Sequence, residues 1–225
     1  MNKNFSRINL LFVLITIFTT SFAEDIFCDA DSDCFYVPKK VKKLKQKVPA
    51  LIYLDCGGAT AKNLDSIKII GDSLKWILAC CHKSRNHRNS LLNDKDIVKT
   101  YQKLVRNYKV DSSRIFLYGF SGMGVQALME LFLHPEFFRG VMAVCAHSGA
   151  MGFAQLENLK DNLIYLVSRS EDWNLKENLL IHQQFQEFRI LDTLVITPGK
   201  HNIGDKFELL QGCLWLSRNS NNKKP

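Results

Sequence analysis

The chain has 225 residues, of which 46% are hydrophobic and 23% are charged, and its 30 lysines and arginines outnumber 22 aspartates and glutamates. This length and balance exclude a disordered chain, and they fit one sizeable domain with little room for a second. The formal charge of +8 does not indicate nucleic-acid binding, because no aromatic residues alternate with the basic ones. Much of the basic excess lies between Lys39 and Lys47, which we interpret as a solvated hairpin loop rather than an anionic-surface contact.

The first 23 residues have the features of a cleavable signal peptide. Lys3 and Arg7 give a positive start, the segment 10–18 is apolar except for Thr16, and the segment 21–23 resembles a small-x-small cleavage site. The apolar segment is shorter than the roughly 20 residues of a membrane-spanning helix. We therefore expect export and cleavage, with the mature protein in the periplasm or outside the cell and no stable membrane insertion.

The seven cysteines are interpreted in that exported context. An odd number cannot pair completely within one chain, and Cys28 and Cys34, close together near the mature start, are the candidate disulfide. Cys56, Cys80 and Cys145 lie in apolar stretches and are interpreted as small core residues. The sequence has no C-x-x-C motif and no histidine spacing suited to zinc, so it predicts no structural metal, and we expect no other cofactor.

Apolar runs typical of buried strands alternate with segments of helical period along the rest of the chain. The predicted strands cover residues 35–38 (an edge strand ended by proline), 48–54, 76–81, 115–119, 140–146, 163–168 and 193–197. The predicted helices cover residues 63–74, a segment that begins at a cap on Asn93 or Asp94, 125–133, 175–190 and 206–216. This alternation predicts one α/β domain over residues 24–218, with a mostly parallel sheet and helices on both faces, followed by a polar tail over 219–225.

The stretch from Arg114 to Gly124, RIFLYGFSGMG, predicts a strand, a sharp turn and a helix in immediate succession. A serine on such a turn has an exposed hydroxyl above the positive end of the helix, where an acyl-transfer nucleophile has to stand. Met123 occupies the place where a G-x-S-x-G motif has its last glycine, and Gly124 follows one position later. Glycine and serine are also ordinary turn residues, so Ser121 needs support from elsewhere in the chain.

That support comes from residues that follow other strands, because ligands of parallel sheets bind beyond the carboxyl ends of the strands. A serine nucleophile needs a histidine to take its proton and a carboxylate to orient the histidine. Asp172 follows the strand at 163–168 and His201 follows the strand at 193–197. Glu171 is the alternative acid, whereas Asp192 begins its strand and is expected at the opposite edge of the sheet.

Five short motifs carry a family resemblance. They are FYVP at 35–38, GFSG at 119–122, HPEFFRGVMAV at 134–144, RSEDWN at 169–174 and PGKH at 198–201. Through them the mature chain resembles the α/β-hydrolase fold, a three-layer sandwich, and is similar to small secreted esterases of the feruloyl-esterase and polyhydroxyalkanoate-depolymerase kind. The resemblance implies a Ser121, Asp172 and His201 triad that cleaves a carboxylic ester through an acyl-enzyme. Peptide hydrolysis, acyl transfer and an inactive binding protein of the same fold are the alternatives.

The tetrahedral intermediate of such a reaction needs N–H donors, each worth roughly 2.7–4 kcal/mol. The Gly122 N–H is one expected donor. By the resemblance the second comes from the turn after the strand at 48–54, at Cys56 or Gly57, although relatives often have a His-Gly pair there. Two glycines that only make a tight turn are the alternative interpretation.

The remaining expectations concern the substrate. His82 and His147 end strands and are candidate pocket residues, with surface histidines as the alternative, and Trp173 is a candidate pocket wall or a core residue. Only about 16 residues separate Ala146 from Leu163, too few for a lid domain. We therefore expect an open cleft for a small or polymeric ester. The other histidines are interpreted as structural, namely His87, His134 and His182.

Overall fold

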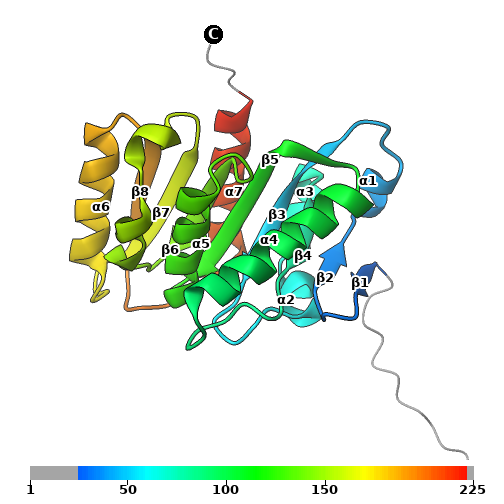
Figure 1. Cartoon of the computed structure of the whole chain (residues 1–225), viewed down its shortest axis with the longest axis horizontal. Coiled ribbons are helices and arrows are strands. Elements are labelled where there is room, and N and C mark those ends of the chain that lie inside the picture. The colour runs from blue at the N-terminus through cyan, green and yellow to red at the C-terminus, as the bar shows by residue number, and fades with distance from the viewer. Residues whose placement is uncertain (1–24, 222–225) are drawn as a thin grey trace, which may run out of the picture.

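The computed structural model describes residues 25–221, and the predicted leader at 1–23 lies outside the described residues. One sheet of eight strands, in the order β1-β2-β4-β3-β5-β6-β7-β8, lies between two layers of helices (Figure 1). The strands are β1 (Ile26–Cys28), β2 (Cys34–Tyr36), β3 (Val48–Leu54), β4 (Ile77–Cys80), β5 (Val110–Phe120), β6 (Gly140–Val144), β7 (Leu163–Arg169) and β8 (Leu191–Thr197). All pairings from β4 to β8 are parallel, and those of β1 with β2 and of β2 with β4 are antiparallel. The mostly parallel sheet that the sequence predicts is confirmed.

The helices connect these strands across both faces of the sheet. They are α1 (Lys39–Lys42), α2 (Ala61–Ser66), α3 (Lys68–Leu74), α4 (Ser90–Asn107), α5 (Gly122–Leu133), α6 (Leu175–Glu187) and α7 (Lys206–Ser220). Two short 3₁₀ helices, η1 (Ser148–Phe153) and η2 (Leu156–Leu159), are the only helices between β6 and β7 in the described chain. The last helix runs four residues past its predicted end, so the tail predicted to begin at residue 219 is helical at its start.

The amino-terminal part of the sheet differs from the prediction. The strand expected at the edge, β2, has β1 on its outer side. The basic segment 39–47 is not a hairpin loop, because β2 pairs with β4 and not with β3. Its first residues form α1, whose Val41 is buried, and Lys42 Nζ donates to an Asp25 carboxylate oxygen at 3.1 Å.

Two helix boundaries also differ from the prediction. The helix expected over 63–74 is divided at buried Ile67, whose φ of −111° and ψ of 11° separate α2 from α3. The next helix begins earlier than expected, because the Asn89 side chain, and not Asn93 or Asp94, accepts hydrogen bonds from the first N–H groups of α4. Asn93 instead turns into the interior, where its Nδ2 donates to the Arg85 carbonyl oxygen at 3.0 Å.

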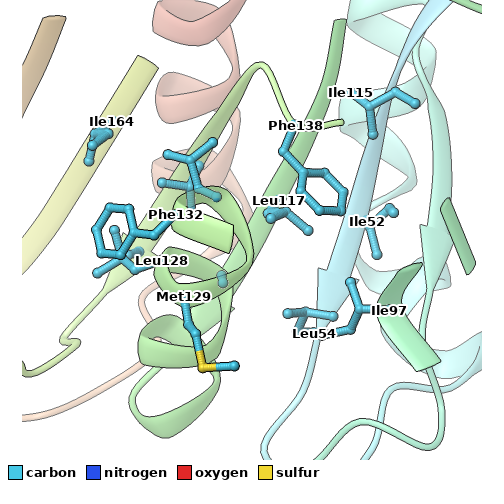
Figure 2. Packing of buried hydrophobic residues seen from close by; sticks show 14 of the residues in the cluster. Ile52, Leu54, Ile97, Ile115, Leu117, Leu128, Met129, Phe132, Phe138 and Ile164 are labelled. Carbon is cyan, nitrogen blue, oxygen red and sulfur yellow. The ribbon is translucent and has the colours of Figure 1, made fainter. Parts of the chain in front are cut away.

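The core has two layers, because successive residues of a strand point to opposite faces of the sheet. Ile52 and Leu117 belong to the cluster that α4, α5 and α6 cover, and Leu51 and Phe116 belong to the cluster under α2, α3 and α7. Figure 2 shows the first cluster, in which side chains of α4 and α5 lie against β3 and β5. Burial on both faces explains why β3 to β7 are continuous apolar runs in the sequence.

The cysteines follow their predicted roles with one exception. Cys28 and Cys34, the pair expected from the sequence, form a disulfide between β1 and β2. Cys80 and Cys145 are buried, whereas Cys56 is only half-buried and its thiol donates to the Phe120 carbonyl oxygen at 3.2 Å. None of the helices within residues 25–221 is long and apolar enough to cross a membrane.

A buried carboxyl lies between α4 and α5. Glu130 is fully buried, and Gln126 Nε2 donates to its Oε1 at 2.6 Å, while its Oε2 has no partner among the described residues. Burial raises the pKa of Glu130 to about 9, and the charge of Asp94 adds to the rise. Glu130 is therefore protonated at neutral pH in the folded chain.

This carboxyl makes stability depend on pH. Between its ordinary pKa of 4.5 and the folded value of about 9, the folded chain holds a proton that the unfolded chain has released. The free energy of unfolding should therefore fall as pH rises from 5 to 9, by at most about 1.4 kcal/mol per pH unit from this group. Urea denaturation of wild type and Glu130→Gln at pH 5, 7 and 9 measures it. The variant should lose less stability, and equal losses in both proteins would contradict the assignment.

Candidate active site

Ser121 lies at the junction of β5 and α5, on the turn that the sequence predicts. Its φ of 53° and ψ of −126° are sparsely populated for a residue with a side chain, and such conformations persist only where the surroundings enforce them. Two hydrogen bonds hold it, from Ser121 N–H to the Val144 carbonyl at 2.8 Å and from Val125 N–H to the Ser121 carbonyl at 3.1 Å. The hydroxyl is thereby directed away from the sheet, above the amino terminus of α5.

Close packing of α5 on the sheet enforces this turn. A Cβ on Gly119 would lie 2.0 Å from the Met123 carbonyl oxygen, and a Cβ on Gly124 would lie 3.2 Å from the Cβ of Ala146. Met123 itself is buried in the core. Gly124, which stands one position later than the last glycine of the G-x-S-x-G motif, is therefore the residue at which α5 comes close to β6. The Met123 side chain packs in the core instead.

The three residues predicted to act together are hydrogen-bonded in a line. Ser121 Oγ lies 2.9 Å from His201 Nε2, and His201 Nδ1 lies 3.1 Å and 3.2 Å from the two carboxylate oxygens of Asp172. Ser121 follows β5, Asp172 follows β7 and His201 follows β8. The carboxyl edge of the sheet thus brings together side chains that are up to 80 residues apart in the sequence.

Asp172 occupies a polar pocket that favours its ionised form. Burial on its own would raise the pKa of Asp172, but hydrogen bonds from the Cys145 thiol, the Asn174 N–H at 2.8 Å and His201 outweigh burial and lower it. The ionised carboxylate can then accept the His201 Nδ1 proton. Glu171, the alternative acid, is exposed and has no hydrogen bond to His201. Asp192 lies at the start of β8, where His182 Nδ1 is 2.5 Å from its carboxylate.

A buried arginine, absent from the predicted site, holds the loop that carries His201. Arg169 Nη1 and Nη2 donate to the two carboxylate oxygens of Glu208 at 2.7 and 2.8 Å. The same guanidinium donates to the Asn202 side-chain and backbone oxygens, both at 3.1 Å, and to Thr197 Oγ1. It therefore joins the end of β7, the end of β8 and α7 around the residue next to His201. We call Arg169 and its partners Glu208, Asn202 and Thr197 the Arg169 clamp. These partners lie up to 39 residues from Arg169 in the sequence, so no local sequence pattern indicates the clamp.

Two aromatic rings flank the His201 imidazole. Trp173 stacks on it with ring centroids 4.0 Å apart, and the Phe120 ring centroid lies 4.9 Å away. Trp173 is 72% exposed, so it is not a core residue but a solvent-facing cover over the histidine.

The proposed oxyanion donors differ in availability. The Gly57 N–H already donates to Asp55 Oδ1 at 2.8 Å, which makes it a poor second donor. In the described part of the chain no hydrogen bond uses the N–H of Gly122 or of Cys56. Asn86 joins these two residues: its N–H donates to the Cys56 carbonyl at 3.0 Å, and its Oδ1 lies 2.5 Å from where a Cβ on Gly122 would stand. The sequence does not predict a role for Asn86, because no motif or pattern distinguishes it from the other residues of the loop between β4 and α4.

Two hollows are lined in part by residues of β5, of α5 or of the loop after His201. The first, about 270 Å³, is lined by residues that include Gly122, Asn86 and His147, and the second, about 520 Å³, by residues that include Tyr118 and Phe207. His147, a predicted pocket residue, therefore faces a hollow. His82 lines neither of these two hollows, and its Nδ1 lies 3.1 Å from the Ala59 carbonyl oxygen beneath the glycine turn.

Two groups of side chains have atoms of metal-ligand type within 4.8 Å of one another. They are Cys145 with Asp172 and His201, and Asp94 with Glu130 and His134. In the first group both His201 nitrogens already face hydrogen-bond partners, and in the second His134 Nε2 lies 2.7 Å from Asp94 Oδ1. Both arrangements are explained by hydrogen bonding, and the absence of a structural metal stays a prediction.

Comparisons with protein-family models and with curated protein sequences gave no match. Solved structures do match. A ferulic acid esterase has a TM-score of 0.69 at 13% identity, with 87% of this chain and 96% of that chain covered. The fluorophosphonate-binding serine hydrolase F of Staphylococcus aureus has a TM-score of 0.66 at 10% identity, with 85% and 96% covered.

A putative dipeptidyl aminopeptidase IV of Bacteroides ovatus has a TM-score of 0.62 at 17% identity, and the match covers 84% of this chain but only 33% of that one. The chain thus spans about a third of the peptidase and nearly all of the two smaller proteins. Identities this low show a shared fold. The chain has the α/β-hydrolase fold that its sequence predicts, and residues 25–221 include no large lid.

The close approach at Gly119 can be tested by adding one methyl group. Gly119→Ala should lower the free energy of unfolding by at least about 2 kcal/mol, because the backbone of α5 would have to move away from β5. Gly152→Ala is the matched control, since a Cβ there meets nothing within 4 Å, and it should change stability by less than about 0.5 kcal/mol. Urea denaturation measures both. Equal stability of the two variants would contradict the packing described here.

Removal of the Arg169 guanidinium should lower the free energy of unfolding more than Gly119→Ala does. Arg169→Met leaves Glu208 without its partner, so we expect a loss of about 3 kcal/mol in the free energy of unfolding. The exposed Arg106 on α4 gives the control, Arg106→Met, which should be close to wild type. Urea denaturation compares them. If Arg169→Met unfolds at the wild-type midpoint, the guanidinium does not hold the loop.

Proposed function

We propose that this chain is an exported serine hydrolase that cleaves a carboxylic ester through Ser121, His201 and Asp172. The observation that carries the proposal is the unbroken hydrogen-bonded line from Ser121 Oγ through His201 to the Asp172 carboxylate. A serine hydroxyl becomes a useful nucleophile only when a neighbouring base can take its proton.

The proposed reaction has two halves. In the first, Ser121 Oγ attacks the ester carbonyl carbon as His201 Nε2 takes the hydroxyl proton. The resulting oxyanion accepts hydrogen bonds from the Gly122 and Cys56 N–H groups. His201 then gives the proton to the departing alcohol, which leaves Ser121 acylated. In the second half, His201 removes a proton from water, the water oxygen attacks the acyl carbon, and Ser121 regains its proton as the acid departs.

The surroundings of Ser121 favour an accessible or polymeric ester. Only η1 and η2 stand between β6 and β7, so no domain covers the turn among the described residues. We propose that hydrolysis needs no lipid interface. A steep rise in rate above the micellar concentration of a lipid ester would contradict this. Amide hydrolysis and acyl transfer are alternatives on the same three residues, because the matched structures include both an esterase and a peptidase.

Export is part of the proposal. The predicted leader supports it, and so does the Cys28–Cys34 disulfide, since such bonds persist mainly in oxidising compartments.

The direct test is hydrolysis of short 4-nitrophenyl esters by wild type and Ser121→Ala. The variant should lose at least about a thousandfold in kcat, because no other described hydroxyl is hydrogen-bonded to His201. Ser113→Ala, an exposed serine at the start of β5, should retain wild-type activity. Equal rates in wild type and Ser121→Ala would overturn the assignment of the nucleophile.

Covalent labelling separates an enzyme from an inactive protein of the same fold. A fluorophosphonate should modify wild type at Ser121 and leave Ser121→Ala unmodified, as read by intact mass. An unlabelled wild type that also hydrolyses no ester would indicate a binding protein instead.

A further inference from the structure

The hollow beside Gly122 differs in chemistry from the hollow that Tyr118 and Phe207 line. We call it the Gly122 hollow, and it is lined by residues that include Arg85, Asn86, His87, Arg88, Gly122 and His147. The other hollow is lined largely by aromatic and aliphatic side chains, among them Tyr53, Tyr118, Ile203 and Phe207.

The Gly122 hollow carries positive charge without a balancing negative one on its walls. Two arginines and two histidines line it, and no aspartate or glutamate is among its lining residues in the described chain. Arg88 is neutralised, because its Nη2 lies 2.6 Å from an Asp96 carboxylate oxygen. Arg85 has no carboxylate within 4.0 Å among the described residues. One uncompensated guanidinium therefore stands at the wall.

Arg85 is held in a fixed part of its loop although its side chain is exposed. Its N–H donates to Asn93 Oδ1 at 3.3 Å, and its carbonyl accepts from Asn93 Nδ2 at 3.0 Å. These two bonds tie the backbone to buried Asn93 on α4. The guanidinium thus extends from an anchored position and keeps its own donors free for a ligand.

The hollow is next to the proposed reacting atoms. Gly122 follows Ser121 directly, and the Asn86 side chain fills the space where a side chain on residue 122 would stand. Arg85 and Asn86 are consecutive, so their Cα atoms are about 3.8 Å apart. The volume of about 270 Å³ is below that of pockets for drug-sized ligands. Arg85 and Gly122 line the same hollow, so a short substituent on an ester carbonyl attacked by Ser121 would enter the hollow that the Arg85 side chain lines.

We propose that the Gly122 hollow binds a carboxylate of the substrate, so that the natural ester carries a negative charge a few atoms from its scissile carbonyl. Arg85 provides the charge-assisted hydrogen bonds, for which a planar guanidinium is the best donor to a carboxylate. The inference rests on the proposed function and adds a substrate class to it. The carboxylate can belong to the acyl part or to the alcohol part of the ester, and the experiment has an arm for each.

The acyl arm compares mono-4-nitrophenyl glutarate with neutral 4-nitrophenyl pentanoate. The alcohol arm compares 4-carboxyphenyl acetate with neutral phenyl acetate. For each pair kcat/KM is measured with wild type, Arg85→Gln and Arg85→Glu. We expect wild type to prefer the charged ester in one arm, and we expect Arg85→Gln to lower the charged-to-neutral ratio in that arm about tenfold or more. Arg85→Glu should lower it further, because it places a like charge at the wall.

Arg106→Gln is the matched control, since it removes the same charge from the far end of α4, 16 residues or about 24 Å along the helix from Ser90. It should leave the ratio in both arms unchanged. The ratio in wild type should also fall when the salt concentration is raised, because exposed charges are screened.

Three outcomes oppose the inference, and they are distinct. A wild type that hydrolyses the neutral esters without preferring a charged one would overturn the carboxylate site and leave the serine hydrolase intact. A preference that Arg85→Gln and Arg85→Glu do not alter would overturn the role of Arg85. A wild type that hydrolyses none of the four esters would refute the proposed esterase function, and this inference with it.

Discussion

The close approach of α5 to the sheet is the constraint on which the site depends. A helix can come this near to a strand only where the facing residues lack a Cβ, and Gly119 and Gly124 provide that condition. The proximity compels the connecting residue into a conformation with positive φ, which directs the Ser121 hydroxyl to solvent. The position of the Ser121 hydroxyl therefore depends on the local backbone and not on its contacts with His201 and Asp172.

The partners come from the other half of the sheet. Strand order places β6 between β5 and β7, so the residues after β7 and β8 have to reach back across a neighbouring strand to meet Ser121. In the loop after β8, Asn202 accepts hydrogen bonds from Arg169, and Arg169 also donates to Glu208 on α7. Because the Arg169 side chain is buried and Glu208 is half-buried, the geometry at His201 depends on an ion pair that is not hydrogen-bonded to Ser121, His201 or Asp172. His201 is thus positioned by contacts between distant parts of the chain, whereas Ser121 is positioned by the turn that carries it.

Much of this arrangement was predictable, and the physical reason is periodicity. Strands buried on both faces give continuous apolar runs, which locate β3, β4, β6 and β7 to within two residues and the apolar end of β5, and the edge strand β8 is predicted from a shorter apolar run. Chain order together with strand ends selects Ser121, Asp172 and His201. The errors lie where a distant contact decides the outcome. Asn89 takes the cap of α4 because Asn93 is drawn into the interior, and β1 covers the strand expected at the edge of the sheet. Asn86 and Arg169 act through residues 28 or more positions away, which no local pattern reveals.

The indole over His201 gives the molecule an intrinsic optical probe. The chain has three tryptophans, and only Trp173 both stacks on the imidazole and is largely exposed, whereas Trp76 is buried under the sheet. A ligand bound at Ser121, next to His201, should change the environment of this indole, because the indole stacks on the same imidazole. Emission from Trp173 should therefore report occupancy of the site without any attached dye, even for molecules that are never chemically converted.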